Sequence, residues 1–427
     1  MNNHAISPWL RFCQIVAVST MFAGYPLVAA TAQLTGLPST PLSIGMRTVT
    51  AAACVWIFLI APSSSRSSLS QMILGPLAIF WIFFLIRMAN DTFYYGHVLT
   101  FEPYSYWVWG VGGCFIPLLG ISKMQFYDGI GEEIFRWTFY LTMAAAILTI
   151  PNIGTSLQLE GGELQETGRG LIQGLNPISL GHLGVQLLVM GVWYLFLRPD
   201  WRLSLSNVRY VIGMIVGTYL ALVANSRGPL VAFVFVALFA FAASRLRSRY
   251  VLLGLLFLGA VAFVPIINLV DALSGTAIYA RLFEQSQFEE VNTIARIELY
   301  NSAWSLFLDH PLLGAGLEDP TFGGYPHNVF IEAFMATGIF GGVAFAVGVL
   351  AAVYAAFQIM REAPLYAWIA LIALQQLISA QLSGTLVQTT TMWGGIGLII
   401  SITSSLARQS HRERSYRQIP ASLIQGR

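Results

Sequence analysis

Long apolar segments separated by short polar ones fill the chain almost from end to end. A helix needs about 20 mostly apolar residues to cross a bilayer, and twelve segments reach that length. They are residues 10–32, 43–62, 71–89, 104–122, 134–150, 179–197, 207–224, 228–244, 250–269, 328–357, 365–385 and 389–407. The pattern predicts an all-α polytopic membrane protein with about 12 transmembrane helices and one long structured outer loop, residues 270–327.

Composition agrees with this pattern. Of the 427 residues, 56% are hydrophobic and only 10% are charged, whereas soluble domains carry about 25% charged residues. Three cysteines, Cys13, Cys54 and Cys114, all lie in apolar segments. Their odd number and wide spacing argue against disulfides and against a zinc site.

The distribution of Lys and Arg predicts the orientation. With the N-terminus in the cytoplasm, sixteen basic residues fall on the inner side and four in the outer loops, while Arg47 and Arg87 lie within spans two and three. Because inner loops carry the excess of basic residues, both termini are expected to be cytoplasmic.

Three regions are expected along the chain. Residues 1–204 form the first six transmembrane helices, residues 205–407 form a second transmembrane domain that includes loop 270–327, and residues 408–427 form a disordered basic tail. Inside the long loop, residues 293–309 show the helical periodicity of an amphipathic helix. The Gly- and Glu-rich residues 151–178 are expected to be a solvated loop.

Arginines on the outer side are the first candidate chemistry. Arg47, Arg87, Arg227, Arg281 and Arg296 all lie near the outer face, where an arginine needs a partner or a function. A helical wheel places Arg296 on the apolar face of its helix, which predicts a desolvated guanidinium that pairs with a carboxylate or binds an anion. Snorkelling or local salt bridges are the alternative for each arginine taken alone.

A second candidate lies where the long loop enters span ten. His327 titrates near neutral pH and could take a proton from a hydroxyl; an interfacial, hydrogen-bonded histidine is the alternative. Glu332 is the one acidic residue clearly within a span, and it shares a helix face with Asn328. His182 and His310 lack such a context, and no function is expected for them.

Several classes of chemistry lack a sequence signal. No outer loop carries an Asp-x-Asp motif or a His/Asp cluster at metal spacing. The chain also has no Gly-rich phosphate loop. No metal, cofactor, nucleotide-sugar donor or nucleic-acid partner is therefore expected.

The stretch from Ala295 to Gly342 resembles the C-terminal domain shared by O-antigen ligases and O-antigen or exopolysaccharide polymerases. His310-Pro311-Leu312-Leu313-Gly314-Ala315-Gly316 follows the helix that contains Arg296 and Trp304. His327, Asn328, Gly338 and Gly341 then match the ligase pattern His-(Asn/Ser/Gln)-x9-Gly-x-x-(Gly/Thr/Tyr). The turn Asn225-Ser226-Arg227-Gly228 resembles the segment that holds another essential arginine of the family. The resemblance covers roughly residues 205–345.

This resemblance implies a metal-independent, inverting glycosyl transfer on the periplasmic face of the bacterial inner membrane. The donor would be an oligosaccharide linked to undecaprenyl diphosphate, and the acceptor a glycan or lipid A–core. By resemblance, Arg227, Arg296 and His327 are the catalytic candidates. Arg281, Arg47 and Arg87 are expected to bind the diphosphate on the charge argument alone, with Asn328 and Glu332 beside them. A chain-length regulator and a flippase are candidate partners.

Polymerisation of repeat units is favoured over ligation to lipid A–core because loop 270–327 is short for docking a large acceptor. The rival from another class is a secondary transporter or lipid flippase, since twelve spans with both termini inside is a common transporter layout. Against it, the halves show no repeat, and the candidate residues gather on one face instead of the membrane midplane. In a purely structural subunit, the outer arginines would be replaceable without consequence.

Overall fold

The computed structural model describes residues 7–62, 66–94, 99–127, 129–160, 163–171, 175–199, 204–244, 246–274, 278–279 and 287–417. Its longer elements, in chain order, are α1 (Pro8–Thr35), α2 (Ser39–Ile60), α3 (Ser68–Ala89), α4 (Pro103–Tyr106), α5 (Ile116–Ser122), α6 (Ile130–Thr149), β1 (Gly154–Glu160), β2 (Glu163–Leu171), α7 (Pro177–Val192), α8 (Val208–Val223), α9 (Arg227–Ala243), α10 (Leu246–Ser274), α12 (Gln287–Asp309), α13 (Val329–Glu362), α14 (Ala367–Ser383) and α15 (Thr390–Arg417).

All twelve predicted spans coincide with apolar helical segments. Ten helical segments in the described residues are long and apolar enough to cross a membrane. The shorter helices α8 and α9 coincide with the other two predicted spans. The fourth span is composite, since a π-helical stretch, Trp107–Phe115, joins α4 to α5. The membrane-spanning part of the chain is therefore all-α and polytopic, as its hydrophobic pattern predicts.

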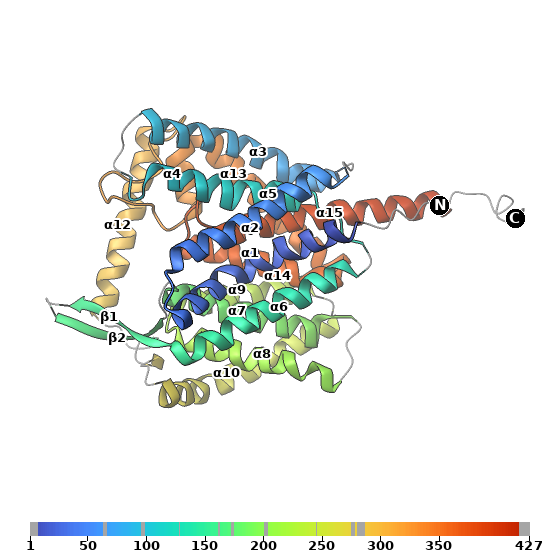
Figure 1. Cartoon of the computed structure of the whole chain (residues 1–427), viewed down its shortest axis with the longest axis horizontal. Helices are drawn as coiled ribbons and strands as arrows, with labels where there is room; N and C mark the ends of the chain where they lie inside the picture. Colours follow the sequence, from blue (N-terminus) through green and yellow to red (C-terminus); the bar gives the residue numbers. More distant parts are fainter. Residues whose placement is uncertain are drawn as a thin grey trace, which may run out of the picture.

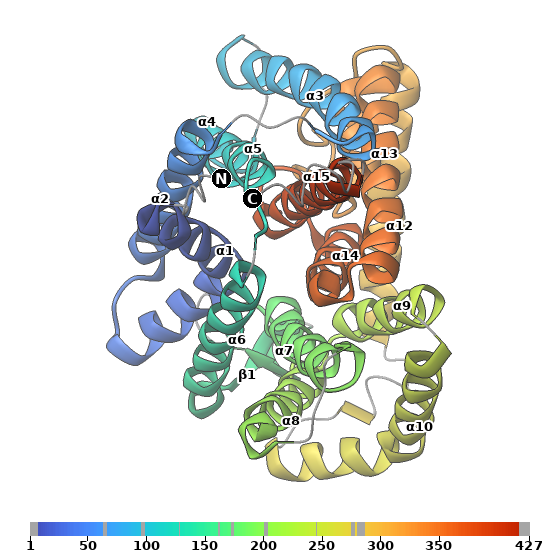
Figure 2. The ribbon, with the colours of Figure 1, turned by 90° about the vertical axis from the view of Figure 1, so that its right-hand side faces the viewer.

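The spanning helices run roughly side by side, and α12 crosses one end of the bundle (Figure 1). The start of α1 and the end of α15 lie at the opposite end. Viewed along the bundle, α15 lies between α5 and α13, with α14 beside it (Figure 2). We call the α12 end the outer end and the other the inner end.

Close helix packing depends on small residues, as is usual where lipid surrounds the protein. Helices α7 and α8 meet at Gly184 and Gly217, where a Cβ on Gly184 would lie 2.5 Å from the Gly217 carbonyl oxygen. Large side chains fill the space around α15: Phe80, Trp81 and Phe345 pack on the fully buried Trp393.

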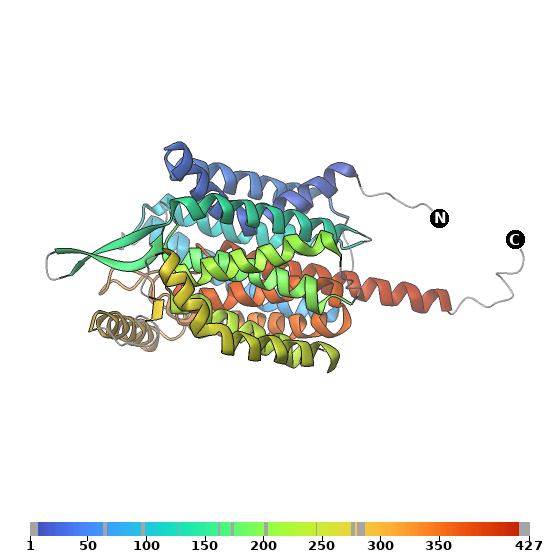
Figure 3. The same ribbon diagram turned by 90° about the horizontal axis from the view of Figure 1, so that it is seen from below.

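Two expectations about connecting segments need correction. The segment 151–178 contains an antiparallel hairpin, β1–β2, that projects beyond the outer end of the helices (Figure 3). Its sequence does carry the signal: Leu157, Leu159 and Leu164 alternate with polar residues around a Gly-Gly pair, and Leu159 pairs with Leu164. The expected disordered tail also begins within α15, which continues to Arg417.

Candidate active site

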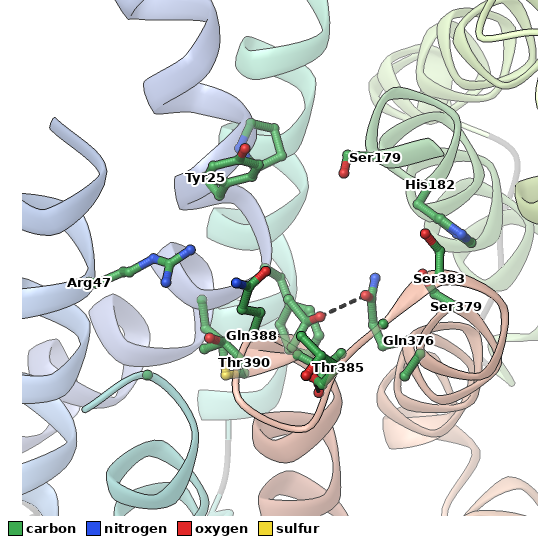
Figure 4. A pocket seen from close by; sticks show the side chains of 18 of the residues that line it. Tyr25, Arg47, Ser179, His182, Gln376, Ser379, Ser383, Thr385, Gln388 and Thr390 are labelled. Carbon is green, nitrogen blue, oxygen red and sulfur yellow. Dashed lines mark hydrogen bonds between the residues drawn. The ribbon is translucent and has the colours of Figure 1, made fainter. Parts of the chain in front are cut away.

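A cavity of about 390 Å³ opens among the outer halves of the helices. Its walls come from α1, α2, α5, α7, α14 and α15 and from the loop that holds Tyr325 and His327. Figure 4 shows polar side chains gathered around it, with Arg47 on one wall and His182 on another. The cavity thus brings together residues from most of the chain.

His327 lies at the rim of this cavity, just before α13 begins. Its backbone has φ 54°, a left-handed conformation that non-glycine residues adopt rarely and often at functional sites. The ring packs edge-on against Tyr325, with ring centroids 4.6 Å apart. Its Nδ1 atom is buried and has no hydrogen-bond partner among the described residues. His327 is therefore held in a constrained position, with one buried ring nitrogen that has no partner among the described residues.

The surroundings of His327 favour its uncharged form. Burial lowers the pKa of the imidazole below its ordinary value, and the positive charge of Arg296 lowers it further, while a hydrogen bond with the Ser383 backbone acts in the opposite direction. An uncharged imidazole at neutral pH can accept a proton, as a general base must.

Arg296 projects from α12 toward the end of α14. Its Nη1 donates a hydrogen bond to the Leu382 carbonyl oxygen at 3.4 Å. The predicted apolar face of α12 is buried toward the C-terminal end of the helix, where Ala303 and Phe307 are buried and Phe307 packs on Phe334 of α13. Arg296 itself is exposed, so the expected desolvation of its guanidinium is wrong.

Arg227 is the first residue of α9, which begins near Leu382. The preceding Asn225 takes a left-handed conformation, φ 46°, which asparagine tolerates better than most residues. A Cβ on Gly228 would lie 3.9 Å from the Leu382 side chain, and the Arg227 side chain is exposed. Arg296 and His327 therefore both contact the Leu382–Ser383 segment, and the start of α9, which carries Arg227, lies beside Leu382.

Arg47 reaches the cavity from α2, apart from those three residues. It lines the cavity wall (Figure 4). Its Nη1 atom is buried and lacks a hydrogen-bond partner within the described part of the chain. A guanidinium held this way is suited to an anionic group of a ligand.

The surroundings of Arg87 differ from those expected of a residue that binds a diphosphate. Its guanidinium donates to the carbonyl oxygens of Leu313, Gly314, Ala315 and Ala336 at 2.6–3.3 Å and to Asp91 at 3.2 Å. These bonds tie the loop before His327 to α3 and α13. The geometry therefore argues for a structural role, because its donors are already occupied.

Replacing Arg87 with methionine should lower stability by about 1.5–3 kcal/mol, the scale for losing hydrogen bonds to a charged group. Thermal unfolding of the purified protein in detergent would measure the change. Arg361→Met is the control, because Arg361 is exposed at the inner end of α13. An unchanged melting temperature for Arg87→Met, together with weaker binding of a diphosphate lipid, would instead support the ligand role.

Asn328 precedes α13 as its N-cap, and together with Glu332 it contacts the end of α14 and the segment that follows it. Asn328 caps α13 by accepting from the Phe330 and Ile331 amides, and its Nδ2 donates to the Gln381 carbonyl. Glu332 is buried and accepts hydrogen bonds from the Thr385 hydroxyl and the Leu386 amide. Their direct contacts are therefore to protein, and they position the backbone around Ser383. Arg281 lies outside the described residues.

The glycines of the motif shape the loop before His327. Gly338 interrupts α13 with φ 63° and ψ −161°, and the Ile339 amide, freed from the helix, donates to the Pro311 carbonyl at 2.7 Å. A Cβ on Gly338 would overlap the Leu312 carbonyl oxygen. The His310–Gly316 segment thus lies directly against the break in α13.

Sequence reasoning missed two polar stripes that line the cavity. Each consists of residues at positions i, i+3 and i+7, which share one face of a helix. The α7 stripe is Ser179, His182 and Gln186, and the α14 stripe is Gln376, Ser379 and Ser383. This periodicity of polar residues inside predicted spans was the available signal, and His182 belongs to it.

Comparison with known families agrees with the sequence resemblance. Residues 212–346 match the model of the family described as O-antigen ligase. By this match, we call residues 212–346 the O-antigen ligase domain. The match covers less than half of the chain and supports the resemblance to the O-antigen ligase and polymerase family, and the apolar helices identify a multi-pass membrane protein. No curated protein matches the chain significantly.

The O-antigen ligase domain contains the catalytic candidates Arg227, Arg296 and His327. It contributes only Tyr325 and His327 to the described lining of the cavity. The remaining walls come from helices before and after the domain.

Proposed function

We propose that this protein is a metal-independent, inverting glycosyltransferase that moves a glycan from undecaprenyl diphosphate to an acceptor hydroxyl on the periplasmic face of the bacterial inner membrane. The position of His327 and Arg296 at the Leu382–Ser383 segment, on the rim of an outer polar cavity and beside the start of α9 that carries Arg227, is the observation that carries the proposal. The sixteen-to-four distribution of basic residues supports placing this end in the periplasm.

Each group has a role in a single displacement at the anomeric carbon of the donor. His327 accepts the proton of the acceptor hydroxyl as that oxygen forms its bond to the carbon. The bond from the carbon to the diphosphate oxygen breaks on the opposite face, which inverts the configuration. Arg227 and Arg296 stabilise the negative charge of the leaving undecaprenyl diphosphate. The displacement needs no redox partner.

We further propose that the acceptor is a second lipid-linked repeat unit, so that the protein polymerises O-antigen or exopolysaccharide. The outer loop between α10 and α13 is of modest length, and α12 is the one long helix in the part of this loop that the structure describes. Transfer to lipid A–core is the alternative, favoured by the description of the matching family as a ligase. A transporter is disfavoured because the candidate groups gather at one end of the bundle.

Deletion of the gene in its host separates these functions. Single repeat units accumulating on the polyprenyl carrier would identify a polymerase, whereas long polymer on the carrier with bare lipid A–core would identify a ligase. Envelope glycans resolved on gels and extracted lipid-linked intermediates provide the measurement. Normal glycans in the deletion strain would contradict the glycosyltransferase proposal.

The pH dependence of transfer tests the roles of His327 and Arg296 together. A base must be unprotonated, so activity is lost as pH falls through its pKa. Because burial and Arg296 lower the pKa of His327, wild-type activity should persist below the ordinary histidine value of about 6.5. Arg296→Gln removes the neighbouring positive charge, so the pKa rises and the acidic limb should move to higher pH.

Relative transfer rates of the purified protein, measured from pH 5 to 8, would show this movement independently of any loss in maximal rate. Arg361→Gln, at the inner end, should leave the profile in place. An acidic limb that stays fixed in Arg296→Gln would argue against electrostatic coupling of the two residues.

A further inference from the structure

His182 is unusual among the polar residues inside the bundle. It is 6% exposed, and neither ring nitrogen has a hydrogen-bond partner among the described residues. Its neighbour on the α7 stripe, Gln186, is satisfied, since its amide donates to the Phe22 carbonyl and the Thr142 hydroxyl. A buried polar group without a partner is costly. Because His182 lines the cavity, a ligand there could supply the missing hydrogen bonds.

The other polar groups indicate the chemistry of that ligand. The α14 stripe faces the cavity with an amide and two hydroxyls, and Gln376 accepts from Thr391 while its amide donors remain for other partners. Among the described lining residues, Arg47 carries the only fixed charge, and no carboxylate is present. Amides, hydroxyls and an imidazole supply both hydrogen-bond donors and acceptors. This mixture suits a ligand whose own groups, such as hydroxyls, can both donate and accept.

Aromatic rings and size point to the same kind of molecule. Tyr25 and Tyr325 both line the cavity, and aromatic faces pack well on the C–H faces of sugar rings. The volume of about 390 Å³ lies within the range of small-molecule sites, roughly 300–1,000 Å³. A short stretch of sugar fits this combination.

We propose that the cavity is a sugar subsite that holds a ring of the glycan beside His327, and that His182 binds a hydroxyl of this ring. The inference rests on the proposed glycosyltransferase function and adds the group that the cavity recognises. Since most of the walls lie outside the O-antigen ligase domain, the domain supplies the reacting groups and the surrounding helices select the sugar.

Binding to the purified full-length protein in lipid nanodiscs tests the subsite. One probe is the repeat-unit oligosaccharide, released from the host glycan by mild acid; the other is undecaprenyl diphosphate without sugar. His182→Phe should weaken oligosaccharide binding about 10- to 100-fold, as expected for a lost buried hydrogen bond and an obstructed cavity. Binding of undecaprenyl diphosphate should not change.

His310→Phe is the matched control, because His310 is exposed at the end of α12 and does not line the cavity. Gln376→Leu, on the opposite wall, provides a second test if His182→Phe fails to fold, and it should also weaken the oligosaccharide selectively. Equal oligosaccharide affinity in wild type and the folded variants would overturn the subsite, as would an equal loss for both probes.

Competition identifies the source of the sugar. Displacement of the free oligosaccharide by the lipid-linked repeat unit, but not by undecaprenyl diphosphate, would place the donor glycan in the cavity. Simultaneous binding of both would place the acceptor glycan there. Failure of the glycosyltransferase proposal is recognised separately, by normal glycans in the deletion strain and by wild-type protein that binds neither probe.

Discussion

Replacing His327 with alanine should reduce glycosyl transfer by about 10²- to 10⁴-fold, the usual contribution of a general base. The imidazole lies at the cavity rim with its Nδ1 unpaired among described residues, and its lowered pKa keeps it able to accept a proton at neutral pH. Transfer rates of the purified protein with its lipid-linked repeat unit would measure the loss. Complementation of the deletion strain would show the same defect as missing polymer.

Two variants separate chemistry from backbone conformation. His327→Asn retains a residue that tolerates the left-handed φ of 54° but lacks a comparable base, so it should be as inactive as His327→Ala. His310→Ala should transfer normally. Wild-type rates for His327→Ala would exclude this histidine as the base, and high activity of His327→Asn would reduce its role to positioning.

Replacing Gly338 with alanine should destabilise the protein by about 2–6 kcal/mol. Its backbone, φ 63° and ψ −161°, lies in a region that is essentially restricted to glycine and costs another residue about 1–3 kcal/mol, and overpacking adds typically 1–3 kcal/mol. Overpacking arises because the new Cβ would overlap the Leu312 carbonyl and lie 2.6 Å from the Leu313 amide nitrogen. The expected result is a lower melting temperature in detergent and less folded protein in the membrane.

Gly45→Ala is the control for this substitution. Gly45 lies within α2, and a Cβ there would meet no atom within 4 Å. The melting temperature of the Gly45→Ala variant should stay the same or rise slightly, since alanine has a higher helix propensity than glycine. Equal melting temperatures for Gly338→Ala and wild type would show that α13 and the His310–Gly316 segment can separate without cost.

The motif in the O-antigen ligase domain therefore combines chemistry and architecture. His327 faces the cavity, whereas Asn328 caps α13 and Gly338 admits the preceding loop. Arg87, although remote in sequence, fastens the same loop through its carbonyl oxygens. These residues fix the position of His327, so some losses of activity in this region are expected to arise from displacement of the imidazole.

The hydrophobic pattern by itself determined the twelve spans, because lipid requires about 20 apolar residues in each helix whatever their neighbours are. The sequence resemblance likewise predicted the O-antigen ligase and polymerase family and identified Arg227, Arg296 and His327 as candidates. Local alternation in the segment that forms β1–β2 was sufficient to predict a hairpin but was outweighed by its many Gly and Glu residues.

Only the tertiary structure decided which outer arginines share a site. The solvation of an arginine and the number of its free N–H donors depend on which residues the other helices place nearby. Arg296 is exposed to solvent, whereas the N–H groups of Arg87 donate to four carbonyl oxygens of a loop and of α13. The cavity has the same origin, since α7 and α14 are about 190 residues apart in sequence and their polar stripes meet only when the bundle packs. Long-range packing, which no local pattern encodes, placed His182 and Arg47 in the same cavity as His327.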